Sequence, residues 1–214
     1  MLKIFTETLD QDRKDLLPLL TKLPKGGVLN GGTALALQIG HRKSYDFDFF
    51  YNKPIPKNAL LNLRKLFGSN LSRAMVDNPD ELTVIIKKDI KLTLLHYPFT
   101  YLHKRIIWKG IKLAAIQDIA SAKAYAVGRR GVWRDYVDLY FILRDHLTLS
   151  NIINASEKRY QGVFDARLFL EQLTYYEDLE DMTIEYTSKP ISEKLIKDFL
   201  NKSVEDYLKK QKII

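Results

Sequence analysis

The sequence contains no cysteine and no long apolar run, and each absence removes a class of protein. Without cysteine, the chain cannot form disulfides, use a thiol nucleophile or bind a metal through thiolates. No apolar segment approaches the length of about 20 residues that a membrane-spanning helix needs. The residues from Met1 to Glu7 also lack the apolar core and cleavage site of a signal peptide, so we expect a cytoplasmic protein without a membrane partner.

Repeats, low-complexity tracts and Pro/Gly/Ser-rich linkers are absent too, and 214 residues suffice for one or two domains with a sizeable core. What the chain has in excess is positive charge. Its 34 Lys and Arg residues against 26 Asp and Glu residues give a formal net charge of +8. Such an excess attracts polyanions, so nucleotides and nucleic acids are reasonable partners. Solubility alone would explain the same charge equally well.

The spacing of apolar residues predicts an α+β fold, in which a small mixed sheet flanked by helices precedes a helical part. The sheet part is expected to contain helices over residues 7–23, 33–38 and 58–67, and strands over residues 28–30, 45–50, 81–86 and 90–95. The last two strands read as a hairpin. Further helices are expected over residues 118–130, 133–143, 164–173 and 192–208. We place the domain boundary near residue 105, which gives domains of residues 1–105 and 106–214.

One segment carries a pattern with chemical meaning: a glycine pair, Gly31 and Gly32, followed by two aspartates, Asp46 and Asp48. Polar and apolar residues alternate around the aspartates, so both carboxylates lie on one face of a strand. Paired carboxylates are hard ligands of the kind that hold Mg²⁺, and without a cation they repel each other. Glycines at a helix start let backbone N–H groups approach phosphate. A glycine pair alone is usually only a turn, and alternating aspartates alone are usually the solvated face of an edge strand. The combination of the two is more specific.

Gly31-Gly32 followed by Asp46-Phe47-Asp48 resembles the signature of the DNA polymerase beta nucleotidyltransferase superfamily. The stretches 31–37 and 41–48, together with residues 118–140 and more weakly 173–178, resemble its AbiEii/AbiGii toxin branch. The resemblance implies a small nucleotidyltransferase sheet followed by a helical domain, Mg²⁺ as cofactor and an NTP as substrate. It also implies a toxin of a toxin–antitoxin or phage-defence pair, with a cognate antitoxin as partner. Such toxins transfer NMP to an acceptor hydroxyl, and transfer RNA is a known target class.

The same resemblance assigns roles to individual residues. Asp46 and Asp48 would bind the metal and, with Lys123 and Asp138, form the catalytic set. Lys123 matches a helix lysine expected to contact phosphate, and Asp138 matches a further acid of the site. Contacts to the nucleotide are expected from Gly31, Gly32, Thr33, Arg42, Ser44, Lys123 and Arg130.

The residues of the helical part also have ordinary explanations. Lys123 could be a surface lysine, and Arg130 could belong to a basic helix end that the helix dipole favours. Arg134 and Asp138 stand one turn apart and could simply pair if Asp138 faces water. If Asp138 instead faces the sheet, it joins the two strand aspartates. We expect Asp135 to be the solvated acid of this helix.

At one position the sequence departs from the superfamily pattern. Many members carry a third carboxylate on a later strand, where it acts as general base or second metal ligand, but the candidate strand here has Thr93 near its middle. Asp89 stands only at the start of that strand. Asp138 or a hydroxide on the metal would then have to serve as base. The alternative function is a catalytically decayed fold that binds only nucleotide, RNA or a partner protein.

Aromatic residues Tyr97, Phe99, Tyr101 and Trp108 interleave with basic residues between positions 103 and 109. This pattern can stack bases and hold phosphates. Packing between two domains would explain it as well. The sequence pattern does not identify the NTP or the acceptor.

Overall fold

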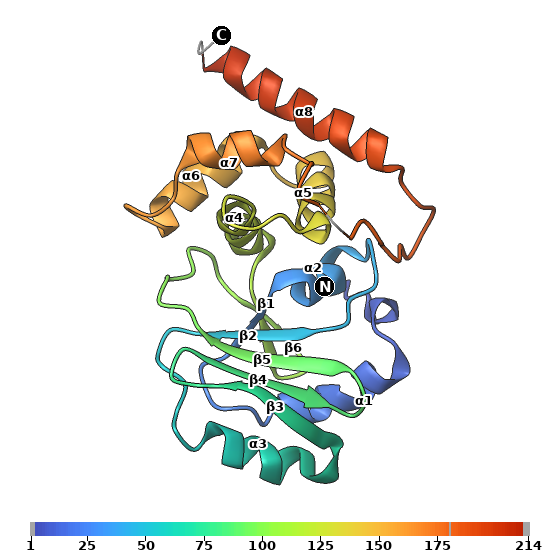
Figure 1. Cartoon of the computed structure of the whole chain (residues 1–214), viewed down its shortest axis with the longest axis vertical. Helices are drawn as coiled ribbons and strands as arrows, with labels where there is room; N and C mark the ends of the chain where they lie inside the picture. The colour runs from blue at the N-terminus through green and yellow to red at the C-terminus, as the bar shows by residue number, and fades with distance from the viewer. Residues whose placement is uncertain (1–2, 180, 212–214) are drawn as a thin grey trace. The chain divides into compact units, whose positions relative to one another are not determined.

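The computed structural model describes residues 3–179 and 181–211. They belong to two compact units, Met1–Ala115 and Ile116–Ile214, which we call the sheet unit and the helical unit. The sheet unit extends to Ala115 instead of residue 105, because two short strands, β6 (Ile106–Trp108) and β7 (Ile111–Leu113), join its sheet. The α+β architecture predicted from the sequence, a mixed sheet with helices followed by a helical part, is confirmed (Figure 1).

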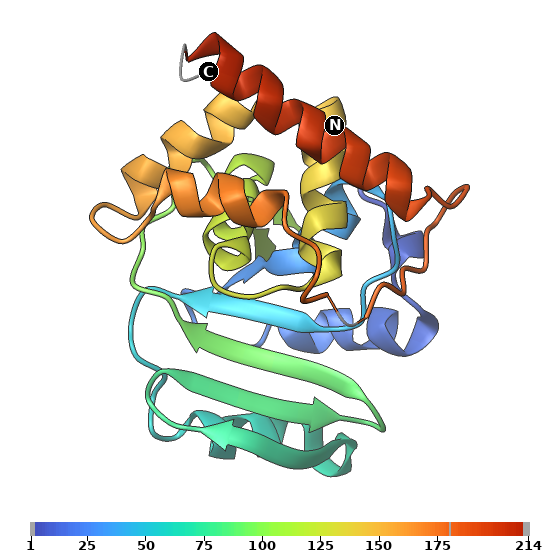
Figure 2. The same ribbon diagram turned by 45° about the horizontal axis from the view of Figure 1, so that its top comes forward.

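Within the described residues, the sheet unit has one seven-stranded mixed sheet in the order β3-β4-β5-β2-β1-β7-β6. Its remaining strands are β1 (Val28–Asn30), β2 (Phe47–Tyr51), β3 (Leu71–Asp77), β4 (Glu81–Ile86) and β5 (Ile90–His96). The predicted hairpin of β4 and β5 is antiparallel, and β5 runs parallel to β2, beside which it lies in Figure 2. The helical segments are η1 (Thr6–Thr8), α1 (Gln11–Leu20), α2 (Gly31–Ile39), α3 (Ala59–Phe67) and η2 (Gly68–Asn70).

The two faces of the central strands differ in character. One face is apolar and buried, and its residues include Phe47, Phe49, Leu82, Val84, Leu92 and Leu94. The other face carries polar residues that alternate with these, because successive strand residues point to opposite sides. On this polar face Asn30, Asp48, Thr93 and Thr83 follow one another across β1, β2, β5 and β4. The sheet therefore presents one row of polar side chains around Asp48.

The helical unit consists of α4 (Ile116–Val127), α5 (Trp133–Asp145), α6 (Leu149–Arg159), α7 (Ala166–Leu173) and α8 (Glu193–Lys210). α4 packs against α5, α6 and α7, and α8 packs across the same three helices (Figures 1 and 2). Four of these helices match predicted ones. α6 was not predicted, although a capping box formed by Thr148 and Asn151 marks its start. No helix in the described part of the chain is long and apolar enough to cross a membrane.

Candidate active site

Asp46 and Asp48 stand at the start of β2, on the polar face of the sheet. Phe47 and Phe49, which alternate with them, are buried, whereas both aspartates are only partly buried. This alternation places the two carboxylates on the same face, with the apolar core on the other side of the strand. Two partly solvated carboxylates two residues apart can therefore reach one ligand.

The glycine pair lies directly against Asp48. Asn30 at the end of β1 caps α2, because its Oδ1 accepts a hydrogen bond of 2.8 Å from the backbone N–H of Gly31. Gly31 has φ of +65°, a left-handed conformation that favours glycine. A Cβ atom at this position would lie only 3.2 Å from Oδ2 of Asp48. The backbone conformation thus favours glycine where the helix start meets the carboxylate, and any larger residue would press against Asp48.

Arg42 occupies the space beside the second glycine. A Cβ atom on Gly32 would overlap the Arg42 guanidinium, which is buried and donates from Nη1 to the carbonyl of Lys43 at 2.9 Å. The structure thus brings Gly32 and Arg42 together at the N-terminal turn of α2. A guanidinium beside backbone N–H groups at a helix start is an arrangement that suits an anion.

Thr33 and Ser44 connect α2 to the segment before β2. Their hydroxyl oxygens lie 2.7 Å apart, and the Thr33 hydroxyl also donates to the backbone carbonyl of Asp46. Both side chains are buried. These contacts support a role in positioning Asp46, while the predicted contact of Thr33 and Ser44 with nucleotide stays a prediction.

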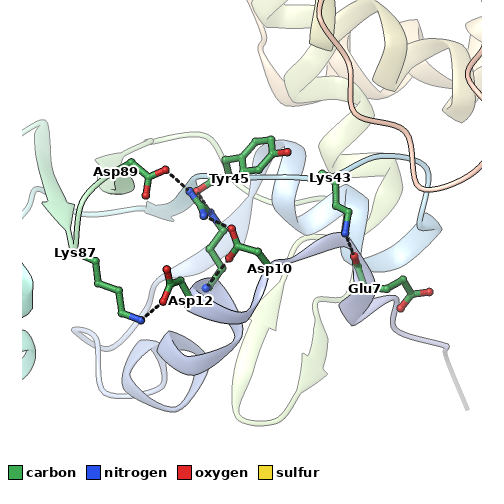
Figure 3. A network of polar contacts seen from close by, with 8 residues as sticks. Glu7, Asp10, Asp12, Lys43, Tyr45, Lys87 and Asp89 are labelled. Carbon is green, nitrogen blue, oxygen red and sulfur yellow. Dashed lines mark hydrogen bonds and ion pairs between the residues drawn. The ribbon is translucent and has the colours of Figure 1, made fainter.

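Arg13 fixes the same segment from α1. It is 4% exposed and donates from Nε to the backbone carbonyl of Tyr45 at 2.7 Å, while its guanidinium also lies 5.0 Å from the Tyr45 ring. Two residues earlier, the ammonium of Lys43 donates to the carbonyl of Glu7 at 2.7 Å (Figure 3). The backbone that leads into the two aspartates is therefore held by several side chains. No local sequence pattern indicates this role of Arg13, which depends on a contact with a residue 32 positions away.

The turn between β4 and β5 is tied to α1 by ion pairs (Figure 3). Nζ of Lys87 lies 2.5 Å from Oδ1 of Asp12, and Oδ2 of Asp89 lies 3.5 Å from Nη2 of Arg13. The hydrogen bond from Lys87 lowers the pKa of Asp12, and the same contact raises the pKa of Lys87. Because Asp12 and Asp89 are exposed, these pairs orient the turn more than they stabilise the fold.

Lys91 was not predicted as a site residue, yet it lies beside Asp46 on the neighbouring strand. Its Nζ is 3.6 Å from Oδ2 of Asp46, and the two side chains are 42% and 32% exposed. Two residues further along β5, Thr93 lies in register with Asp48. The strand on which a third carboxylate was considered therefore carries the hydroxyl of Thr93 beside Asp48 and the ammonium group of Lys91 beside Asp46.

The paired aspartates have the chemistry that Mg²⁺ requires. Carboxylate oxygens are its preferred protein ligands, and Mg²⁺ commonly takes one or two carboxylates and completes its shell with phosphate oxygens and water. The missing side chain of Gly31 leaves space next to Oδ2 of Asp48. Across residues 3–179 and 181–211, no cluster of three or more His, Asp or Glu residues is placed to hold a metal. Asp46 and Asp48 therefore supply the kind and number of protein ligands that Mg²⁺ commonly takes.

A buried ion cluster joins α4 to α5 in the helical unit. Nζ of Lys123 lies 2.6 Å from Oδ1 of Asp135 and 2.6 Å from Oδ2 of Asp138, and all three residues are buried. Nη2 of the exposed Arg130 lies 3.2 Å from the second oxygen of Asp135. The structure thus brings the predicted residues Lys123, Arg130 and Asp138 together within this unit.

For these helices one expectation was wrong, and two of the alternatives left open by the sequence do not hold. Asp135 is 2% exposed and is not a solvated acid, since two cations hold it inside the unit. Lys123 is 7% exposed and so is not a surface lysine. Asp138 is fully buried against Lys123, so a surface pairing with Arg134 does not describe it. Sequence spacing could not distinguish these arrangements, because the ion cluster joins two helices.

The interleaved aromatic and basic residues form contacts within the sheet unit. The Tyr101 hydroxyl accepts a hydrogen bond of 3.3 Å from Nδ2 of Asn30, and the Arg105 guanidinium lies 5.6 Å from the Tyr101 ring. Nζ of Lys109 lies 5.5 Å from the Trp108 ring. These are distances at which a cation is attracted to an aromatic face. The contact with Asn30 also places Tyr101 next to the cap of α2.

Comparison with known proteins gives related chains over nearly the full length. The family model described as "Nucleotidyl transferase AbiEii toxin, Type IV TA system" matches residues 21–211. An uncharacterized protein of Aquifex aeolicus is 29% identical over 204 residues, which cover 92% of this chain and 97% of that protein.

Solved structures share the fold. The nucleotidyltransferase toxin MenT4 of Mycobacterium tuberculosis superposes with a TM-score of 0.60 at 17% identity, covering 90% of this chain and 80% of that one. A proposed nucleotidyltransferase of Helicobacter pylori gives a TM-score of 0.56 at 19% identity, covering 94% of both chains. At these identities the two structures establish the similarity of fold alone.

Proposed function

The chain belongs to the AbiEii nucleotidyltransferase toxin family, and we propose that it transfers NMP from an NTP to a hydroxyl of RNA, with transfer RNA as the acceptor. Membership makes it a nucleotidyltransferase enzyme of a toxin–antitoxin family. The metal, the acceptor, the site residues and a cytoplasmic location, where NTPs and transfer RNA are found, are parts of the proposal. A cognate antitoxin is the partner that the family implies.

The observation that carries the proposal is the meeting of Gly31 with Asp48. A helix start, which favours phosphate, lies against a carboxylate pair, which favours a divalent cation. A triphosphate complexed with Mg²⁺ supplies both the anion and the cation. Few other ligands would use the two features together at such close range.

Each group has a defined task in this proposal. Asp46 and Asp48 would hold Mg²⁺, which when bound neutralises phosphate charge and makes the acceptor hydroxyl more acidic. Backbone N–H groups at Gly31 and Gly32, together with Arg42, would orient the triphosphate. Their contribution is to position the reacting groups and to stabilise negative charge, which is most of what nucleotidyl transfer needs from a protein.

Lys123, Asp138 and Arg130 are assigned to the same reaction as a further proposal. The amino group of Lys123 is buried between two carboxylates and contacts both at 2.6 Å. An ammonium group that is pre-organised in this way would stabilise charge on a phosphate without reorganising. Asp138 would keep Lys123 in place, and the exposed guanidinium of Arg130 would add a second contact to phosphate.

Label transfer from nucleotide to RNA tests the proposal directly. Each of the four NTPs, labelled with ³²P at the α-phosphate, is incubated with Mg²⁺ and total transfer RNA, and the wild type is compared with Asp48→Asn. Label should enter RNA with the wild type and disappear with Asp48→Asn, since the amide is a far weaker ligand for Mg²⁺. Full activity in the variant would refute the assigned metal site.

The same assay separates the rival functions. Label that enters protein or a small molecule, with none in RNA, would replace the proposed acceptor and retain the chemistry. Nucleotide binding without transfer to any acceptor would favour the catalytically decayed fold, which the absence of a carboxylate at Thr93 makes a specific rival.

A further inference from the structure

The sheet edge formed by β6 and β7 carries positive charge without an acidic residue. The segment 101–115, which contains both strands, has four Lys and Arg residues and no Asp or Glu. The segment 21–27, between α1 and β1, adds two lysines and no acid. All six side chains are exposed, and they are Lys22, Lys25, Lys104, Arg105, Lys109 and Lys112. In the described part of the chain, the ion pairs of the sheet unit belong to other cations, among them Arg13, Lys87 and Lys91.

The two basic segments meet around a cavity. A Cβ atom on Gly110, in the turn between β6 and β7, would lie 3.5 Å from Cγ2 of Thr21 at the end of α1. The cavity between them has a volume of about 240 Å³, and a cavity of about 150 Å³ already holds benzene. Its apolar walls include Leu20, Leu23, Phe49 and Ile111, and three of its lining residues are glycines, Gly26, Gly27 and Gly110. Because glycines leave backbone N–H and C=O groups uncovered, the cavity suits a flat ring with polar edges, such as a nucleobase.

Trp108 lies next to this cavity. It pairs with Ile111 across the hairpin, so the two side chains lie on the same face of the sheet. The Trp108 side chain is partly exposed, and Nζ of Lys109 lies 5.5 Å from its ring. Aromatic rings beside cations are typical of surfaces that stack unpaired bases and hold the phosphates of a single strand.

The basic edge also lies close to the candidate active site. In the sheet order β2-β1-β7-β6, three strand spacings separate β6 from β2, which amounts to about 14 Å. Leu113 is in register with Leu29, which in turn pairs with Phe49 on the buried face. Lys112, which precedes Leu113, therefore lies on the opposite face, the one that carries Asp48. Positive charge thus continues from the face of Asp48 to the sheet edge.

We propose that this basic edge, which consists of the six cations, Trp108 and the cavity, binds a single-stranded part of the acceptor RNA. The inference rests on the proposed function, because that function makes RNA the substrate. The cations hold backbone phosphates, and one unstacked base enters the cavity beside Trp108. An acidic peptide would satisfy the charge alone, whereas a single strand of RNA supplies both phosphates and flat rings.

The charge is tested by RNA binding to the full-length protein without NTP. The probe is a fluorescently labelled, unstructured RNA of about 12 nucleotides, and its anisotropy is measured at several salt concentrations. Lys109→Asn combined with Lys112→Gln should raise Kd about 10-fold and lower the slope of log K against log salt by about 1.4, because two phosphate contacts are lost. Asparagine is chosen because it tolerates the φ of +47° at Lys109.

Arg64→Gln combined with Lys65→Gln provides the matched control. Both side chains are exposed on α3, which packs against β3 at the opposite edge of the sheet. This pair of changes removes the same charge from the same unit. It should change Kd by less than about twofold, since it removes no contact with RNA.

The base contacts are tested with a second probe, an RNA of the same length that lacks its bases. Trp108→Leu, which keeps an apolar side chain but no aromatic ring, should weaken intact RNA about 10-fold at an unchanged salt slope. Thr21→Trp, which adds a ring at the cavity, should have a similar effect. The abasic RNA should bind the wild type about 10-fold more weakly than intact RNA, and neither variant should weaken it further.

The basic edge is overturned if the α3 control weakens RNA as much as the paired lysine changes, or if intact and abasic RNA bind the wild type alike. It is also overturned if the lysine changes weaken only the binding of polyglutamate, which would assign the edge to an acidic protein. In the label-transfer assay, the lysine changes should raise KM for RNA about 10-fold at unchanged KM for NTP. Transfer at the wild-type KM for RNA would overturn the basic edge and leave the proposed function standing. A wild type that binds RNA at this edge but transfers no label to it would overturn the proposed function and leave the binding surface standing.

Discussion

Replacing Gly31 with alanine tests the geometry on which the candidate site depends. The change adds one methyl group at a residue with φ of +65°, where its carbon would lie 3.2 Å from Oδ2 of Asp48. Two separate effects follow. The left-handed backbone becomes unfavourable, and the Asp48 carboxylate must move away from the helix start.

The two effects differ in size and in the property that they change. A left-handed conformation costs a non-glycine residue about 1–2 kcal/mol, which corresponds to a fall in Tm of about 2–8 °C in a chain of this length. Displacement of Asp48, to which the proposed function assigns the metal, by a fraction of an ångström would act on the rate instead. Misplacement by about 1 Å can reduce a rate by roughly 100-fold, so we expect a loss of about 10-fold to 100-fold in kcat.

Gly162→Ala separates the two effects. Gly162 has φ of +77°, and a Cβ atom there would meet nothing within 4 Å. Both variants should lose similar stability in thermal unfolding followed by circular dichroism, but only Gly31→Ala should lose transfer of labelled NMP. If Gly31→Ala unfolds at the same reduced temperature as the control and keeps the wild-type kcat, close contact between the helix start and Asp48 is not part of the catalytic site.

Three smaller changes test other parts of the molecule. Lys91→Met should tighten Mg²⁺ binding to the free enzyme by about 3-fold in calorimetric titration, because it removes a partly screened positive charge 3.6 Å from Asp46; an unchanged affinity would contradict this. Asp135→Asn should lower the free energy of unfolding in urea by about 2 kcal/mol, since buried Lys123 loses one of its anionic partners; a loss below about 0.5 kcal/mol would refute that role. Tyr136→Phe should cost about 1 kcal/mol, because the hydroxyl donates to a carbonyl of α7 at 2.9 Å. Burial raises the pKa of Tyr136 above its ordinary value of 10.0, so this stabilisation is complete below pH 10 and is lost as the pH rises further, which unfolding at pH 9 and 11 would show.

The sequence predicted those elements that have a regular apolar period. The hairpin of β4 and β5 and seven of the helices, α1 to α5, α7 and α8, were predicted because their apolar residues recur with the period of a strand or a helix. β3 was missed because it lies at the sheet edge, where most of its side chains are exposed and apolar alternation is weak. β6 and β7 were missed for a related reason, since each has three residues and too few positions to show a period.

Within the candidate site, too, local features could be predicted from the sequence, whereas contacts between distant segments could not. The shared face of Asp46 and Asp48 follows from strand alternation, and the glycine turn follows from chain order. Lys91 lies on a strand that was predicted, but its contact with Asp46 depends on β5 pairing in parallel with β2. Pairing between strands distant in sequence has no local signal, so this residue became apparent only with the register.

The charges of the candidate residues are compensated separately in each unit. In the sheet unit Lys91 lies beside Asp46, and in the helical unit Asp135 and Asp138 surround Lys123. Neither unit therefore leaves these particular groups buried without an opposite charge, an arrangement that would be costly. In the proposed function, a nucleoside triphosphate with Mg²⁺ carries both signs of charge, so its cation would replace Lys91 as the partner of Asp46. Nucleotide binding at the sheet unit would then exchange one ion pair for another, and no carboxylate would be left without an opposite charge.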